Sequence, residues 1–384
     1  MFPTLSCGCK RLTEYVKLKP GAVTVGKPLL FSVYDVSGNL LLQQGYVITS
    51  REQLDRLYER GLFHVSLAQA VSKRSDQPTV DERRLNPFTE LPVLLEDLET
   101  LLSHIVGTQE DSARRLRQLA GHILRMTEDD PDACLGLVHI NTIEPSAYEQ
   151  TLYHAILAAL IGKHMGWEAE RLISQIMASL TANIALLPFQ DKLNRSRHPL
   201  TEAQRAVLRK HPDLSSQALL RAGISDPLTL AAVQQHHEHP DGSGYPQGIM
   251  GQSIVPEAQV LALTERYTAM ISQRAYRARM PVDQALRELA HHAANPEIYV
   301  AFFAQLTPFP PGVLVELVNG EIAVVTHRTR HPHGPRVRAI ISSRGSMYHG
   351  AFLRESAEIE FAITGLKQLP SQPSLNPVLL WGTV

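Results

Sequence analysis

One stretch of the sequence gathers residue types that can bind metal ions and phosphate groups. It runs His236-His237-Glu238-His239-Pro240-Asp241-Gly242-Ser243-Gly244-Tyr245-Pro246-Gln247-Gly248. Imidazole nitrogens and carboxylate oxygens are the usual protein ligands of divalent transition metals. The prolines and glycines after the two histidines end a helix and let the backbone fold back over a site. The residues alone therefore predict a metal and anion loop or, as the alternative, a histidine-rich surface turn.

Helices must position this stretch. Apolar residues recur at helical spacing from Leu94 to Met126, a short helix is expected from Asp130 to His139, and no alternating strand pattern appears before about Phe303. We therefore predict a mainly α fold, with connecting helices over residues 93–140 and an all-helical bundle over 141–308. A short β-hairpin and tail should occupy residues 309–384.

The sequence ahead of these helices predicts a small α/β module over residues 1–70. Two strands around a tight turn, a helix with Ser50 as its N-cap and Gln53 as the capping-box partner, and a third strand make up the expected order. The strands are expected at Leu29–Tyr34, Leu40–Leu42 and Phe63–Ser66, and the turn at Ser37–Asn39. Residues 71–92 are polar and punctuated by prolines, which is typical of a linker.

Composition narrows the function classes. The formal net charge of -1 predicts no general attraction to nucleic acid or to a membrane surface. The three cysteines form no disulfide framework, and no apolar run approaches the roughly 20 residues that span a bilayer. We also find no basic segment followed by an apolar run at the N-terminus, so no signal peptide is expected. A cytoplasmic protein without a membrane span is the expectation.

The histidine-rich stretch resembles the signature of the HD-GYP domain family. That signature reads His-His-Glu, two residues, Asp-Gly, one residue, Gly-Tyr-Pro, one residue and Gly, and every fixed position is filled here. The flanks agree, since His211-Pro212, Arg274-Ala275-Tyr276-Arg277 and the segment Pro311–Glu321 are similar to further family segments. The resemblance covers roughly residues 130–340 and implies a helical HD-type bundle that hydrolyses cyclic di-GMP in bacteria.

The family resemblance also implies metal ligands and substrate contacts. Histidines and aspartates hold two or three ions, and a hydroxide bridging them attacks the phosphodiester. Carried over position by position, the metal ligands are His154, His211, His236, His237 and Glu265. Tyr245, Arg274 and Arg277 are the expected substrate contacts, because a phenol and forked guanidinium groups suit phosphate.

Several positions depart from the family pattern. Ala182 and Asn183 stand where the family has its His-Asp pair, and Leu186 stands where it has a lysine. Ala182 cannot bind a metal, and Asn183 offers a neutral oxygen in place of a bridging carboxylate. Glu265 is one methylene longer than the family's aspartate. Two cations held about 3.5–4 Å apart need anionic bridges, so we expect at most one divalent ion (iron, manganese or zinc) and no two-metal centre.

Three functions remain open from the sequence. The first is a degenerate HD-GYP protein of cyclic di-GMP signalling, with impaired hydrolysis, that acts by binding nucleotide or signalling proteins. The second is an active metal-dependent cyclic di-GMP phosphodiesterase, and the third is another metal-dependent phosphohydrolase on the same scaffold. The retained Tyr245, Arg274 and Arg277 beside the altered Ala182 and Asn183 favour binding over turnover.

Overall fold

The computed structural model divides into two compact units, residues 1–83 with 371–377 and residues 84–370 with 378–384. The second unit is described over residues 84–140, 142, 145–187, 189, 201–273, 278–291, 295–331, 333–369 and 378–381. The first is described over residues 15–17, 23, 25, 29, 33–34, 40–42, 46–48, 50–59, 63–65, 373 and 375–377.

The first unit is the small α/β module that the sequence predicts. An antiparallel sheet in the order β1-β4-β2-β3 combines with helix α1. The bounds are β1 Tyr15–Lys17, β2 Val33–Tyr34, β3 Leu40–Leu42, α1 Arg51–Glu59 and β4 Phe63–Val65. The backbone N–H of Gln53 donates to the Ser50 hydroxyl at 3.1 Å, which confirms Ser50 as the cap of α1. The expected turn at Ser37–Asn39 lies outside the described residues.

The second unit begins with three helices that underlie the site-bearing bundle. They are α3 Pro87–Val106, α4 Ser112–Asp129 and α5 Pro131–Ile140. The linker expected over residues 71–92 overlaps the start of α3, and this boundary was wrong. Asn86 accepts a hydrogen bond from the backbone N–H of Phe88 at 3.0 Å, and Pro87 occupies the first turn, so this proline starts a helix.

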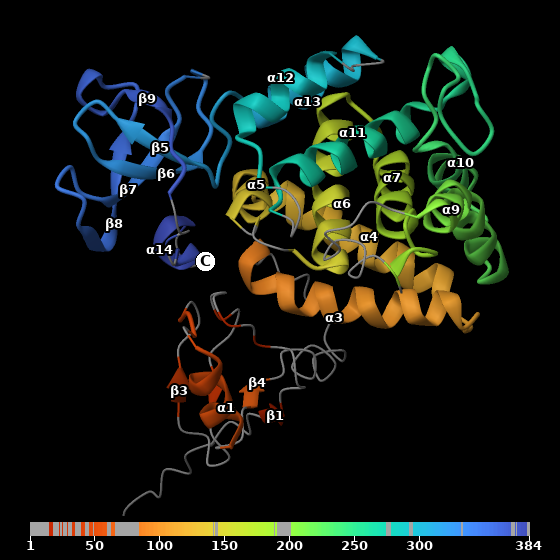
Figure 1. Ribbon diagram of the computed structural model, residues 1–384, viewed down its shortest axis with the longest axis horizontal. Coiled ribbons are helices and arrows are strands. Elements are labelled where there is room, and N and C mark those ends of the chain that lie inside the picture. Colours follow the sequence, from red (N-terminus) through yellow and green to blue (C-terminus); the bar gives the residue numbers. More distant parts are fainter. Residues whose placement is uncertain are drawn as a thin grey trace, which may run out of the picture. The chain divides into compact units, whose positions relative to one another are not determined.

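The bundle that carries the site is helical throughout its described residues, as predicted. Its helices are α6 Ala147–His164, α7 Ala169–Thr181, α9 Glu202–Arg221, α10 Pro227–Gln235, α11 Pro256–Ile271, α12 Val282–His291 and α13 Pro296–Leu306. Helix α6 is buried along most of its length and packs against α7, α11 and α13 (Figure 1). Capping boxes at Ser146 with Glu149 and at Thr201 with Gln204 fix the starts of α6 and α9.

A buried histidine joins α5 to α11. The Nδ1–H of His139 donates to the Leu135 carbonyl at 2.7 Å, so its Nε2 accepts from the Tyr267 hydroxyl at 2.7 Å. Burial lowers the pKa of His139 to about 4, and the imidazole is therefore neutral near pH 7. This histidine is satisfied within the core and has a structural role.

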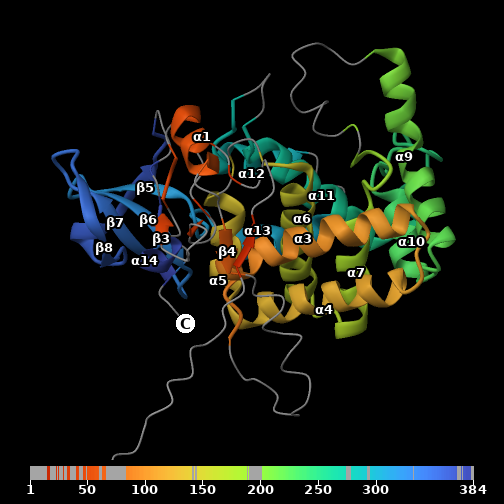
Figure 2. The same cartoon turned by 90° about the horizontal axis from the view of Figure 1, so that it is seen from below.

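The C-terminal region is larger than the predicted hairpin. The hairpin forms between β5 Leu314–Leu317 and β6 Ile322–His327, and β7 Arg336–Ile341, β8 Met347–Glu355 and β9 Ile363–Leu366 extend it. Together they make a five-stranded antiparallel sheet in the order β8-β7-β6-β5-β9. Figures 1 and 2 show this sheet beside α5, at the end of the helical bundle opposite α9 and α10.

A short C-terminal helix, α14 (Pro377–Trp381), fastens this sheet to the helices. The Trp381 indole N–H donates to the Thr326 carbonyl of β6 at 2.9 Å, and its ring lies 5.0 Å from that of Phe88 in α3. A Cβ on Gly136 would lie 2.3 Å from the Trp381 ring, so only glycine fits there. None of the helices in the described part of the chain combines the length and apolar character that a bilayer crossing requires.

Candidate metal centre

The histidine-rich stretch forms a loop closed over one buried carboxylate. Helix α10 ends at Gln235, and the Glu238 side chain accepts the backbone N–H groups of Gln247, Gly248 and Ile249 at 2.7, 3.1 and 3.0 Å. Glu238 is 5% exposed, so these charge-assisted bonds form away from water. The loop is thereby tied back onto the helix end that carries the two histidines.

Close backbone contacts fix the middle of this loop. A Cβ at Gly244 would lie 2.3 Å from the backbone nitrogen of His239 and 2.6 Å from the His237 carbonyl oxygen. Both atoms belong to the main chain and cannot swing away, so position 244 requires glycine. The N–H of the next residue, Tyr245, donates to the His237 carbonyl at 3.1 Å. The glycine thus brings the Tyr245 ring next to the histidines.

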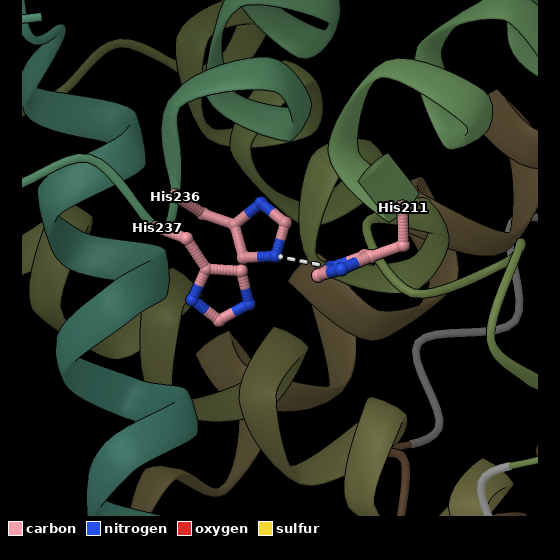
Figure 3. Close-up of side chains that lie close together, drawn as sticks. All are labelled: His211, His236 and His237. Carbon is pink, nitrogen blue, oxygen red and sulfur yellow. Dashed lines mark hydrogen bonds between the residues drawn. The ribbon is translucent and has the colours of Figure 1, made fainter. Parts of the chain in front are cut away.

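Three of the predicted ligands lie together. His236 and His237 follow α10, and His211 faces them from α9 (Figure 3). The ligand nitrogens of His211, His236 and His237 all lie within 4.8 Å of one another, the only such group of three or more histidine, cysteine or acidic side chains in the part of the chain that is described. The three imidazoles are therefore close enough to bind one ion, and their role as ligands stays a prediction.

Hydrogen bonds fix which nitrogen of two rings is available. Nδ1 of His211 lies 2.6 Å from the Leu208 carbonyl oxygen, and Nδ1 of His236 lies 2.8 Å from that of Val233. A carbonyl oxygen only accepts, so both Nδ1 atoms carry a proton and Nε2 is the nitrogen of each ring that can bind a metal. Burial lowers the pKa of His211 to about 4, so its ring is neutral near pH 7.

The Nε2 atoms of His211 and His236 face each other at a distance of 3.2 Å. A cation between them could be bound by both nitrogens. Nitrogens bound to one tetrahedral zinc ion at about 2.0–2.1 Å lie roughly 3.3 Å apart. The donor set and its spacing therefore fit one divalent transition metal.

Tyr245 covers this cluster from one side. Its ring stacks on that of His237 at 4.8 Å between centroids and 26° between planes, and it meets His211 edge-on at 6.4 Å. Burial raises the pKa of Tyr245 above its ordinary range, so the hydroxyl keeps its proton. Burial also lowers the pKa of His237 well below its ordinary value. Tyr245 therefore offers a hydrogen-bond donor beside the three imidazoles.

Glu265 of α11 lies at the edge of the cluster rather than within it. Its Oε2 is 3.8 Å from Nε2 of His236, and its Oε1 accepts a hydrogen bond from the Asn183 amide at 2.5 Å. Burial acts to raise the pKa of Glu265, but the neighbouring imidazoles and the Asn183 amide lower it to about 2. The carboxylate is therefore ionised and within reach of an ion held by His236.

The positions at which the family resemblance implies a His-Asp pair are apolar or neutral. Ala182 follows α7 directly and is fully buried, and Leu186 is 3% exposed. Neither side chain carries a ligand atom. Asn183, between them, is half-buried and presents its amide N–H to Glu265. On this side of the site, Glu265 is the ionised acid that faces the cluster.

The remaining predicted residues divide into two groups. His154 is buried on α6 and acts on the pKa of Glu265, but it is not in the three-histidine group. Its role as a ligand stays a prediction. Arg274 and Arg277 lie outside the described residues, so their contacts with substrate also remain predictions.

Sequence reasoning assigned no role to Glu238, although the residue belongs to the recognised motif. Its three backbone partners lie nine to eleven positions further along the chain. The sequence could have predicted this role, because Glu238 stands just ahead of a glycine-rich turn whose backbone N–H groups need an acceptor. Glu238 holds the loop, and nothing in its contacts suggests that it binds the ion.

Comparison with known proteins agrees with this geometry. The family model described as "HD domain" matches residues 116–298. A cyclic di-GMP phosphodiesterase of Pseudomonas aeruginosa is 26% identical over 224 residues, which cover 56% of this chain and 53% of the relative. A solved HDG"Y"P protein of Bdellovibrio bacteriovorus superposes with a TM-score of 0.51 at 15% identity, covering 75% of this chain and 98% of the other. Together with the motif, these matches support the HD-GYP family for this chain.

A further relative differs in the nucleotide that its name records. A 3'3'-cGAMP-specific phosphodiesterase of Vibrio cholerae is 31% identical over 137 residues, which cover 35% of this chain and 29% of the relative. The alignments therefore span about half the length of the Pseudomonas relative and less than a third of the Vibrio one. The solved neighbour, at its low identity, supports the fold alone.

Proposed function

We propose that this HD-GYP protein acts in cyclic di-GMP signalling by binding the nucleotide or a partner protein, with impaired hydrolysis. The names of its relatives support a cyclic dinucleotide as the ligand class. The proposal rests mainly on the distribution of possible metal ligands, which are more numerous on one side of the site than on the other. Histidines for one ion are gathered at 211, 236 and 237, whereas buried alanine and leucine stand at 182 and 186.

The reaction of the family needs charge that this site lacks. A hydroxide shared by two ions is the nucleophile, and the ions coexist only when anionic ligands bridge them. Asn183 is neutral, and Glu265 is the acidic group beside it in the described site. One ion fits this set of ligands, and a second would have Glu265 and at most His154.

The site could bind a cyclic dinucleotide without hydrolysing it. A single divalent ion, when bound, would supply positive charge for a phosphate oxygen. The Tyr245 hydroxyl, kept protonated by burial, can donate to the same phosphate group. Arg274 and Arg277, if they reach the site as predicted, would add forked donors. These groups recognise a phosphodiester without activating water.

The test combines three measurements on one preparation of the full chain. Elemental analysis counts bound iron, manganese and zinc, calorimetry measures binding of cyclic di-GMP and 3'3'-cGAMP, and chromatography measures their hydrolysis. We expect at most one metal equivalent, measurable nucleotide binding, and turnover far below the ~1 per second typical of enzymes.

Two variants control the metal assignment. His236→Ala should remove the metal, whereas His122→Ala, in α4 and paired with Glu90 at 3.1 Å, should leave it in place. Two metal equivalents together with cyclic di-GMP turnover near ~1 per second or faster would contradict the proposal and establish an active phosphodiesterase.

A further inference from the structure

The hydrogen bond between Asn183 and Glu265 joins two elements far apart in sequence. Asn183 lies in the turn that follows α7, and Glu265 lies in the middle of α11. Its side-chain nitrogen is 2.5 Å from Oε1 of Glu265, while Oε2 is the oxygen that faces His236 at 3.8 Å. One carboxylate thus has one oxygen committed to an amide and the other directed to the histidine cluster.

The main chain holds Asn183 in this place. The N–H of Leu186 donates to the Asn183 carbonyl at 2.8 Å, and the N–H of Ala182 donates to the Ala178 carbonyl at 2.8 Å. The neighbouring Ala185 N–H donates to the Ser215 hydroxyl of α9 at 3.3 Å. The amide therefore approaches Glu265 from an anchored turn, which limits the positions that the carboxylate can adopt.

The identity of the donor matters for the charge of the site. A buried carboxylate oxygen needs a hydrogen-bond donor or a cation. The amide N–H supplies a donor without adding charge. A carboxylate at position 183 would instead leave two acceptors in contact, and only a proton or a cation between them would relieve the repulsion.

We propose that Asn183 is a positioning residue that stands in for a second cation and holds Glu265 as the carboxylate ligand of a single ion. This inference rests on the single-ion site proposed above. Asn183 keeps Oε2 of Glu265 beside His236 and satisfies Oε1 with a neutral donor. The site is then built for one ion rather than being a damaged site for two.

The direct test is titration of the metal-free full chain with Co²⁺, whose visible spectrum reports its ligands. Outer partners that orient metal ligands typically contribute 10–100-fold to affinity. We expect Glu265→Gln to weaken Co²⁺ binding by about 100-fold and Asn183→Ala by about 10-fold, with a shifted spectrum in both. In the Glu265→Gln background, Asn183→Ala should weaken binding no further, because its effect passes through the carboxylate.

The matched control is Asn319→Ala. It removes another amide-to-carboxylate hydrogen bond, from Asn319 to Glu321 at 2.9 Å in the C-terminal sheet, so affinity and spectrum should stay as in the parent. Circular dichroism of each metal-free variant confirms folding. Asn183→Asp keeps the size of the side chain and carries the test if the alanine variant fails to fold.

Asn183→Asp turns the donor into an acceptor, and it should bind a second Co²⁺ at concentrations where the parent binds one. The inference is overturned if Glu265→Gln weakens Co²⁺ binding while Asn183→Ala leaves affinity and spectrum unchanged. It is also overturned if the two variants weaken binding additively. A parent that binds no Co²⁺ would instead remove the single-ion site of the proposed function, and these outcomes are distinguishable.

Discussion

The two walls of the site are built in different ways. The wall formed by α9, the end of α10 and the loop after it holds three histidines, and their supports are backbone groups: the Leu208 and Val233 carbonyls and the three N–H groups bound by Glu238. In the wall after α7, Ala182, Asn183 and Leu186 stand where the family resemblance implies ionisable groups.

The comparison shows which parts of such a site can change without loss of the fold. Replacement of side chains after α7 leaves the helix and its turn intact, because buried Ala182 and Leu186 pack as apolar residues. A change in the loop would disturb backbone hydrogen bonds and close contacts that have no substitute. We therefore expect substitutions in the loop after α10 to destabilise the fold, and substitutions in the wall after α7 to leave it folded.

The largest effect is expected at Gly244. Gly244→Ala forces a Cβ to within 2.3 Å of the His239 nitrogen, so the loop must open and His237 and Tyr245 must separate. We expect the free energy of unfolding to fall by about 4 kcal/mol, with loss of metal binding. Thermal unfolding and elemental analysis measure both. Gly350→Ala, where an added Cβ meets nothing within 4 Å, is the control, and equal losses in the two variants would refute the contrast.

The wall after α7 should tolerate substitutions that introduce the metal ligands implied by the family resemblance. Ala182→His with Asn183→Asp adds an imidazole and a carboxylate, so affinity for a second ion should rise by about 100-fold. Hydrolysis of cyclic di-GMP should recover little, since Leu186 and the longer Glu265 remain and a ligand displaced by ~1 Å can cost on the order of 100-fold in rate.

Metal stoichiometry and turnover of the double variant, and of variants that also carry Glu265→Asp or Leu186→Lys, test this expectation. Full activity in the double variant would show that Glu265 and Leu186 do not limit the reaction.

A smaller effect is expected from Glu238→Gln. The substitution keeps the shape but removes the charge that three N–H groups share, so the unfolding free energy should fall by roughly 2 kcal/mol. Urea unfolding of the metal-free protein provides the measurement. Glu360→Gln, an exposed carboxylate in the C-terminal region, should change it by less than about 0.5 kcal/mol.

The smallest effect is expected on the pH dependence of stability, through the core residue His139. His139 has a pKa of about 4 when folded and an ordinary value near 6.5 when unfolded. The unfolded chain binds the extra proton between these values, so stability is complete above pH 6.5 and falls as the pH drops toward 4. At pH 5.5 this loss is about 1.4 kcal/mol. His139→Gln in metal-free protein should flatten that slope, and an unchanged slope would contradict the assignment.

Helical periodicity in the sequence predicted the helical bundle, and the family resemblance gave His211, His236 and His237 as ligand positions. The sequence could not reveal the bond from Asn183 to Glu265, which joins positions 82 residues apart. The start of α3 was misplaced because Asn86-Pro87 suits both a linker and a helix start.

The sheet beyond the hairpin was missed for a different reason. In β7, the residues Arg336, Val337, Arg338 and Ala339 alternate between more exposed and buried, which is a strand pattern. The neighbouring β8 has no such alternation, since its exposed and half-buried residues follow one another irregularly. Periodicity alone therefore does not identify this edge strand.

The contact of Trp381 with Gly136 and Phe88 has a consequence for the order of synthesis. The tryptophan is translated 245 positions after the glycine that receives it. At elongation rates of about 5–20 residues per second, the gap amounts to roughly 10–50 s. During that interval the Gly136 backbone and the Phe88 ring on a nascent chain are without the indole that covers them. A ribosome stalled between these positions would therefore present an uncovered apolar surface to chaperones.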